Sequence, residues 1–218
     1  MLQTNEYLMP SAIKSERIDI IFLIKLFNDI KQTNFGIFYL NYKNTYFFAS
    51  ELYSLYHYYI KDSKKFGIKV VGINVAEDVD YVNHLSERYY DNSVFPNHSS
   101  AIVPHDFSKE IINKDYDSFD KYVKNEFLPK VNNNEGISNI VIPYLSELFV
   151  NARTHGRTNN ILCAGQIYSI RNKIKFVIVD FGVTIPYNIE NHIINGKKNY
   201  FHENDGDAIR WSTREGTS

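Results

Sequence analysis

Short apolar runs and segments of helical periodicity alternate along the first third of the chain. Phe35–Leu40 and Ile68–Asn74 are nearly continuous apolar runs, which indicate buried strands. Between them, Ala49–Phe66 carries apolar residues at three- and four-residue spacing and ends with two lysines before Gly67, as a helix does. The order strand, helix, strand predicts a parallel crossover.

A further helix is expected before this crossover. The segment Ile18–Lys31 has helical periodicity, and its predicted apolar face consists of Ile20, Ile21, Ile24, Phe27 and Ile30. The first part of the chain is therefore predicted to be a small α/β unit.

The middle of the chain, from Ala76 to Asn134, is more polar. The pattern predicts a helix over Val79–Tyr90, an irregular connection as far as Pro104, and a helix that begins at about Ser108 or Ser118 and ends at Lys130. Such a change of composition is typical of a domain boundary. We therefore expect two domains, residues 1–105 with a linker and residues 106–218.

The second part has the sharper pattern. A helix is predicted over Ile137–His155, and strands over Ile161–Ile170 and Ile174–Asp180, joined by a short polar turn. The expected apolar face of the helix consists of Ile140, Val141, Tyr144, Leu145, Leu148 and Phe149. Antiparallel strands covered by helices predict a two-layer α/β sandwich, so the fold class of the whole chain is α/β (α+β).

Composition and charge narrow the class of function. The 218 residues include 44% apolar residues, and 24 Lys and Arg against 25 Asp and Glu give a net charge of −1, so we expect no broad basic surface for nucleic acid or membrane. The 17 Tyr and 15 Phe are best explained by buried aromatic packing. A single cysteine, Cys163, and the lack of a signal peptide or membrane-spanning run favour a cytoplasmic protein.

Three polar residues of the predicted helix Ile137–His155 suggest chemistry. Glu147, Asn151 and His155 are spaced four residues apart, so they lie along one helix face. The amide oxygen of Asn151 suits Mg²⁺ that already holds phosphate oxygens and water, and Glu147 is placed to deprotonate a water molecule for attack on a γ-phosphate. His155, near the helix end, is interpreted as a C-terminal cap.

A second group of residues follows the last predicted strand. Asp180 ends the strand, and Gly182 follows two residues later, where a missing side chain allows a flat ligand to approach the backbone. An ionised carboxylate only accepts hydrogen bonds, and the exocyclic amine of adenine is a donor, whereas guanine has no amine at that position. Asp180 is therefore predicted to select adenine.

The two groups together resemble the nucleotide site of the GHKL superfamily, the Bergerat-fold ATPases that are similar to histidine kinases. Glu147-x-x-x-Asn151-Ala152 resembles the N box, and Asp180-x-Gly182 resembles the first glycine box. The segment Gly206–Ser218 resembles the one that leads into the ATP lid. The resemblance covers Ile137–Ser218 and implies Mg²⁺ and ATP as ligands, with Thr184 and Thr217 also at the nucleotide.

The resemblance also implies a class of function. GHKL proteins couple ATP binding or hydrolysis to conformational signalling, here in a bacterial regulatory or defence setting with a protein partner or a homodimer. The first third of the chain is similar in pattern to STAS-like domains, which accompany one branch of these ATPases. A generic α/β module is the simpler explanation of that pattern.

Two departures from the family pattern keep alternatives open. Thr184 stands where a second glycine is usual, and the lid glycine motif is expected beyond Ser218, so the Bergerat domain is expected to be incomplete at the C-terminus. The alternatives are a non-catalytic interaction module with a vestigial nucleotide fold, and a serine kinase like those that act on anti-sigma-factor antagonists. In the STAS-like part, Ser50 is the only serine of the strand-to-helix turn Asn41–Ser50.

Overall fold

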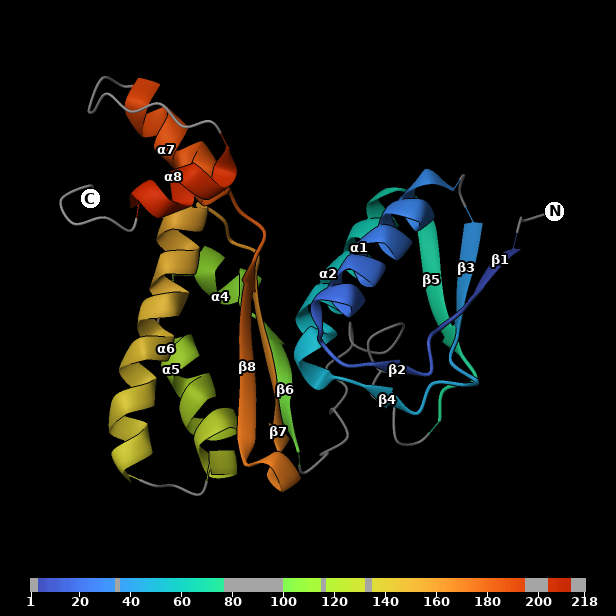
Figure 1. Ribbon diagram of the computed structural model, residues 1–218, viewed down its shortest axis with the longest axis horizontal. Coiled ribbons are helices and arrows are strands. Elements are labelled where there is room, and N and C mark those ends of the chain that lie inside the picture. The colour runs from blue at the N-terminus through green and yellow to red at the C-terminus, as the bar shows by residue number, and fades with distance from the viewer. Residues whose placement is uncertain are drawn as a thin grey trace. The chain divides into compact units, whose positions relative to one another are not determined.

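The computed structural model describes residues 4–33, 36–76, 100–114, 117–131, 135–194 and 204–212. The chain is a mixed α/β protein, as its sequence predicts (Figure 1). Its contacts divide it into two compact units, Met1–His105 with Cys163–Val177, and Asp106–Leu162 with Ile178–Ser218. The first unit therefore includes most of a hairpin that is distant in the sequence, and each unit is described by itself below.

The first unit contains a parallel three-stranded sheet in the order β1-β3-β5. Its elements are β1 (Thr4–Leu8), β2 (Ala12–Ile13), α1 (Arg17–Gln32), β3 (Gly36–Asn41), β4 (Phe47–Phe48), the 3-10 turn η1 (Ser50–Leu52), α2 (Tyr53–Lys65) and β5 (Ile68–Ile73). The parallel pairing of β3 and β5 through α2 confirms the predicted crossover. The short strands β2 and β4 form a separate parallel pair.

Helix α1 packs with a different face from the one predicted. Its buried residues are Leu23, Leu26, Phe27 and Ile30, whereas Ile20, Ile21 and Ile24 are exposed. The prediction was wrong in the first half of the helix because nearly every position from Ile18 to Ile24 is apolar, so periodicity there does not select one face. The contact of α1 with α2 and the sheet selects the face that is buried.

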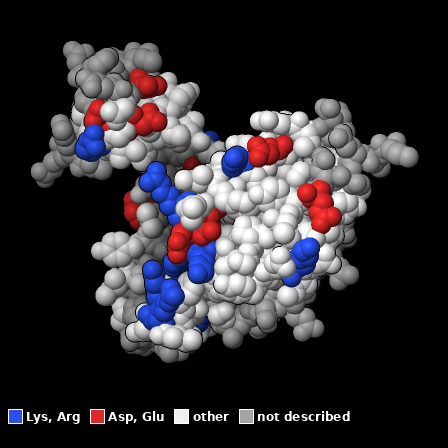
Figure 2. All heavy atoms as spheres, turned by 45° about the vertical axis from the view of Figure 1, so that its right-hand side comes forward, with Lys and Arg blue, Asp and Glu red and all other residues white. Residues whose placement is uncertain are grey.

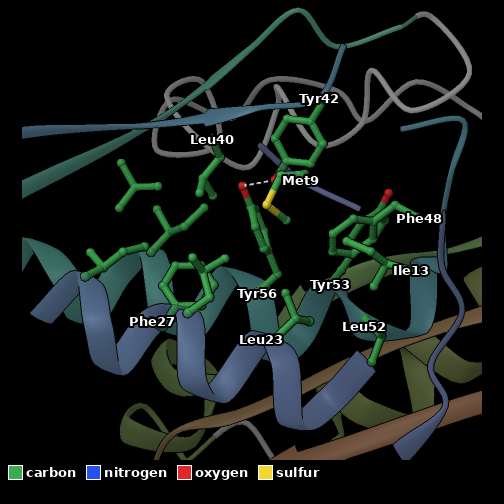
Figure 3. Packing of buried hydrophobic residues seen from close by; sticks show 14 of the residues in the cluster. Met9, Ile13, Leu23, Phe27, Leu40, Tyr42, Phe48, Leu52, Tyr53 and Tyr56 are labelled. Carbon is green, nitrogen blue, oxygen red and sulfur yellow. Dashed lines mark hydrogen bonds between the residues drawn. The ribbon is translucent and has the colours of Figure 1, made fainter. Parts of the chain in front are cut away.

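Aromatic side chains fill the core of this unit, as the composition predicts. Tyr42, Tyr53 and Tyr56 are fully buried, and Figure 3 shows Tyr56 between the helices and Tyr42. The hydroxyl groups of Tyr42 and Tyr56 form a hydrogen bond of 2.7 Å, which satisfies polar atoms that burial would otherwise leave unpaired. Phe27 of α1 stacks on Tyr59 of α2 with ring centroids 5.0 Å apart.

An ion-pair cluster joins α1 to α2 beside this core. Asp62 of α2 accepts from Lys31 of α1 and lies 3.1 Å from the ammonium group of Lys65. Lys31 also lies over the ring of Tyr59, 5.4 Å from its centroid. Burial raises the pKa of the Asp62 carboxyl, but the hydrogen bonds and the positive charges of Lys31 and Lys65 together lower it by more, so the net pKa lies below its ordinary value of 3.8.

We predict that this pair makes the stability of the protein sensitive to acid. Because the folded-state pKa of Asp62 is lowered, its stabilising contribution is complete above the ordinary pKa and is lost as the pH falls through the lowered value. Asp62→Asn should therefore reduce the free energy of unfolding by roughly 0.5–1 kcal/mol at neutral pH. Urea unfolding between pH 7 and pH 2 measures this, and an equal difference between variant and wild type at every pH would contradict the prediction.

The second part of the chain adds a sheet in the order β6-β7-β8 and several helices. Its elements are β6 (Ala101–Asp106), α4 (Ser108–Ile112), α5 (Ser118–Tyr122), the π-helical turn η5 (Val123–Phe127), the 3-10 turn η6 (Leu128–Val131), α6 (Glu135–Gly156), β7 (Ile161–Tyr168), the 3-10 turn η7 (Ser169–Arg171), β8 (Lys173–Asp180), α7 (Ile185–Ile194) and α8 (Asp205–Ser212). The connection between β7 and β8 is too short for a parallel crossover, so they form a hairpin.

The sequence predicted these elements unevenly. The long helix and both strands of the hairpin are confirmed as α6, β7 and β8. The helical segment expected to end at Lys130 begins at Ser118, the later of the two predicted starts, and continues through α5, η5 and η6 to Val131. α4 is a separate short helix at the earlier start, Ser108. The helix expected over Val79–Tyr90 lies outside the described residues.

Four aromatic rings form the core on which α6 packs. Phe149 of α6 stacks on Phe119 of α5 with centroids 4.2 Å apart, and it meets Phe107 edge-on at 5.0 Å. Tyr122 contacts Phe107 at 5.5 Å. The apolar face predicted for α6 is too wide, because Ile140, Tyr144 and Leu148 are 61%, 69% and 56% exposed. These three residues lie on the outer face of α6, because the aromatic cluster contacts the helix through Phe149.

The surface fits the low net charge of the chain. Figure 2 shows lysine and arginine next to aspartate and glutamate on one face of the described residues, with large uncharged areas between them. Among the helices in the described ranges, none has the length and apolar character needed to cross a membrane.

Candidate nucleotide site

Helix α6 places the two N-box-like residues next to each other. The side-chain nitrogen of Asn151 donates to Oε1 of Glu147 over 3.1 Å. Because the Asn151 amide uses its nitrogen in this bond, its oxygen remains an acceptor. Glu147 is exposed and Asn151 half-buried, since both lie on the side of α6 away from the Phe149 cluster.

The strand β8 ends at the predicted adenine-binding carboxylate. The backbone N–H of Gly182 donates to Oδ1 of Asp180 over 3.2 Å, which orients the carboxylate. The side chain of Asp180 is exposed at the strand end. A carboxylate has about four acceptor positions, so this single bond leaves capacity for an external donor.

A close backbone contact brings the end of α6 to the turn after Asp180. A Cβ atom at Gly182 would lie 1.8 Å from the carbonyl oxygen of Gly156, and one at Gly156 would lie 2.7 Å from Oδ1 of Asp180. The same Gly156 oxygen accepts the N–H of Val183 over 2.8 Å. Asn151 precedes Gly156 by five residues, about 7.5 Å along the helix axis, so the two halves of the predicted site belong to one joined structure.

Gly182 therefore has a role that the sequence reasoning did not give it. Its missing side chain was expected to admit a flat ligand, but in the structure it admits the backbone of Gly156. In the sequence, Gly156 directly follows the predicted helix end at His155, a position where glycine ordinarily stops a helix. The helix instead includes Gly156, and Arg157 takes the left-handed conformation with φ of 50°.

The remaining predicted residues lie near this contact or outside the described part of the chain. Thr184 caps α7, because its carbonyl oxygen accepts the N–H of Asn188 over 3.1 Å and its hydroxyl faces the N–H of Tyr187 at 3.4 Å. His155 is exposed, and its carbonyl oxygen accepts from the side chain of Asn188 over 2.6 Å. Thr217 lies outside the described residues.

Asn188 is a neighbour of the site that the sequence reasoning missed. Its side-chain nitrogen donates to the last turn of α6, while its Oδ1 is buried and has no hydrogen-bond donor among the described residues. A buried acceptor without a donor is uncommon in proteins. Nothing in the sequence pattern of Ile185–Ile194 distinguishes this residue, because an asparagine on a helix is ordinarily exposed.

The oxygen donors of the site fit a cation that arrives with its own ligands. The described residues hold no cluster of three or more His, Cys, Asp or Glu side chains that could bind a metal by themselves. Asn151 supplies one amide oxygen and Glu147 lies beside it, a donor set that suits Mg²⁺ carried by phosphate groups.

The chain was compared with protein-family models, with curated proteins and with solved structures. No protein-family model, no curated protein and no solved structure matches the chain.

Proposed function

We propose that the chain binds Mg·ATP as a member of the GHKL class, with the end of α6 and the turn after β8 as the nucleotide site. The observation that carries the proposal is the contact of Gly156 with Gly182, since it joins the Glu147–Asn151 pair to the Asp180 turn. The proposal includes ATP hydrolysis or ATP-driven signalling in a bacterial regulatory or defence setting. It also includes a cytoplasmic location and a protein partner or homodimer.

Each residue has a separate role in this proposal. Asp180 accepts a hydrogen bond from the exocyclic amine of adenine, because the bond from the Gly182 N–H leaves other acceptor positions of its carboxylate available. Asn151 presents its amide oxygen to the cation because its nitrogen is held by Glu147. Mg²⁺, when bound, neutralises charge on the phosphate oxygens.

Glu147 is the candidate general base of hydrolysis. Its carboxylate is exposed, so water can reach it, and its bond to Asn151 keeps it close to the predicted cation position. Glu147→Ala should retain ATP binding and lose hydrolysis if the protein is an ATPase.

We predict that Asp180→Asn weakens ATP binding. In Asp180→Asn, an amide NH2 group replaces one carboxylate oxygen, so a donor faces the donor amine of adenine. Loss of a charged hydrogen bond corresponds to an affinity loss of roughly 10- to 100-fold. Isothermal titration with ATP, ADP and GTP in the presence of Mg²⁺ measures the change. Asp117→Asn is the matched control, because Asp117 is an exposed aspartate of the same unit at the start of α5.

Two results of this titration would contradict the proposal. Equal binding of ATP and GTP by the wild-type protein would show that Asp180 does not select adenine. Unchanged ATP binding by Asp180→Asn would also show that Asp180 does not select adenine. The control Asp117→Asn is expected to bind ATP as tightly as the wild-type protein.

A second candidate function is an interaction module whose nucleotide fold is vestigial. The observation that favours it is the exposed apolar side of α6, with Ile140, Tyr144 and Leu148. Absence of nucleotide binding would favour this candidate. The aromatic residues of the first unit contribute less to it, because its large rings are mostly in the core.

The third option is phosphotransfer to a protein serine in the manner of anti-sigma-factor kinases, and Ser50 of this chain is a poorly accessible target for such a reaction. Its side chain is 2% exposed, and its hydroxyl donates to the carbonyl oxygen of Gly165 over 2.8 Å. A kinase would have to open this contact before it could reach the hydroxyl.

A further inference from the structure

A buried carboxylate of the 3-10 turn η1, directly before α2, binds the β7–β8 hairpin within the first unit. The side chain of Glu51 is 1% exposed. It accepts from the hydroxyl of Ser15, from the hydroxyl of Tyr168 at 2.8 and 3.1 Å, and it pairs with the ammonium group of Lys175 at 3.2 Å. A buried charge is costly without such partners, so all four side chains depend on one another.

Two of the three donors to Glu51 come from the hairpin, one from each strand. Tyr168 is the last residue of β7 and Lys175 the third residue of β8. Burial, followed by the hydrogen bond to Glu51, raises the pKa of the Tyr168 phenol, so it stays a donor. The neighbouring Ser50 adds two bonds to β7, from its N–H to Gln166 at 2.9 Å and from its hydroxyl to Gly165.

Strand β8 connects this anchor to the predicted adenine carboxylate. Lys175 and Asp180 lie on the same strand, five residues apart, a distance of about 17 Å in extended chain. Among the described strands, β8 has a ladder partner on one side only, because it is at the edge of the order β6-β7-β8. Its register therefore depends more on side-chain contacts than that of a central strand does.

The Glu51–Lys175 pair discriminates between registers of β8. A slip by one residue would place Ile174 in front of Glu51 and leave the buried carboxylate without its cation. It would also move Asp180 by about 3.4 Å along the strand direction. Correct pairing at Lys175 thus places Asp180 at the turn where Gly182 and Gly156 meet.

We propose that Glu51 is a positioning residue for the candidate nucleotide site, which it serves by fixing the register of β8 through Lys175 and Tyr168. This inference rests on the proposed function for its effect on ATP, but its effect on β8 can be measured without any nucleotide.

The test is hydrogen exchange of the full chain, followed by mass spectrometry of the peptide that covers residues 173–182. Glu51→Gln keeps the size of the side chain and removes its charge. Loss of this charged contact should accelerate exchange in the peptide by about tenfold. Tyr168→Phe, which removes one donor and leaves the charge pair, should act in the same direction with a smaller effect and serves if Glu51→Gln fails to fold.

The matched control is Tyr42→Phe, which removes a buried hydroxyl hydrogen bond from the core of the same unit. It should leave exchange in residues 173–182 close to the wild-type rate. Unchanged exchange in Glu51→Gln and Tyr168→Phe would overturn the proposal, and so would equal acceleration in Tyr42→Phe, since the effect would then reflect general destabilisation.

Titration with Mg·ATP separates this proposal from the proposed function. Glu51→Gln should raise the dissociation constant for ATP by about five- to tenfold, a typical coupling between sites. If the wild-type protein binds ATP and Glu51→Gln binds it equally well, Glu51 does not position the site. If the wild-type protein binds no ATP, the proposed function fails, and hydrogen exchange alone decides whether Glu51 anchors β8.

Discussion

Phe149→Ala should destabilise the second unit by about 3–5 kcal/mol, the usual cost of removing a buried phenylalanine ring. Phe149 is 3% exposed, and it contacts the rings of Phe107 and Phe119. Removing it would leave a cavity between α5 and α6 and would cost the stacking contribution as well. Because Glu147 and Asn151 depend on the placement of α6, loss of this packing also disturbs the candidate site.

Urea unfolding monitored by tryptophan fluorescence measures this effect. Trp211 is the only tryptophan in the sequence and belongs to the second unit, so its signal reports on that unit. Leu148→Ala is the matched control, since Leu148 is the next residue along α6 and is 56% exposed. It should change the free energy of unfolding by less than about 0.5 kcal/mol. Equal losses in the two variants would contradict the packing of α6 described above.

Gly182→Ala is expected to cost about 3 kcal/mol, at the upper end for an added methyl group in a packed region. The new Cβ would lie 1.8 Å from the oxygen and 2.5 Å from the carbonyl carbon of Gly156. Both obstacles are backbone atoms, so no side-chain rotation relieves the overlap. The end of α6 would have to move away from the turn after Asp180, which breaks the bond from Val183 to Gly156.

Gly206→Ala provides the control for this substitution. At Gly206 the nearest atom to an added Cβ is a side-chain oxygen of Asn204 at 3.1 Å. Gly206 also lies within α8, where alanine is favoured over glycine by roughly 0.5–1 kcal/mol. The control should therefore be as stable as the wild-type protein or slightly more stable. A Gly182→Ala variant of wild-type stability would show that the close contact with Gly156 is not required.

The two substitutions also distinguish the parts of the proposed site. Phe149→Ala acts on the helix that carries Glu147 and Asn151, and Gly182→Ala acts on the joint between that helix and Asp180. Asp180→Asn is directed at the proposed recognition of adenine and removes neither contact. Binding that is lost only in the last variant would support a direct role for Asp180.

Long elements with a clear period could be predicted from the sequence alone. The helix over Ile137–His155 and the strands on either side of the Arg171 turn are confirmed as α6, β7 and β8, because each has enough apolar positions to define a period. The strands β1, β2, β4 and β6 were not predicted. β2 and β4 have two residues each, too few to show alternation, and their pairing depends on partners distant in the sequence.

The spacing of Glu147, Asn151 and His155 along one helix face also follows from the sequence, as does the position of Asp180 at a strand end. The buried side of α1 and of α6 could not be predicted from the sequence, because apolar residues on both sides of these helices leave the periodicity ambiguous. Only the packing of Phe149 against Phe107 and Phe119, and of Leu23 and Phe27 in the first unit, selected the buried face.

The sequence by itself therefore determined the local spacing of the candidate site residues. The contacts that hold these residues in place were decided only by the tertiary structure. Gly156 contacts Gly182, which is 26 residues further along the sequence, and Glu51 contacts Tyr168, which is 117 residues further along. Local propensity and periodicity extend over a few turns or strand residues and carry no information on such pairs. The physical reason is that the role of a buried charge such as Glu51, or of a missing Cβ as at Gly182, depends on the group that lies opposite it in the folded chain.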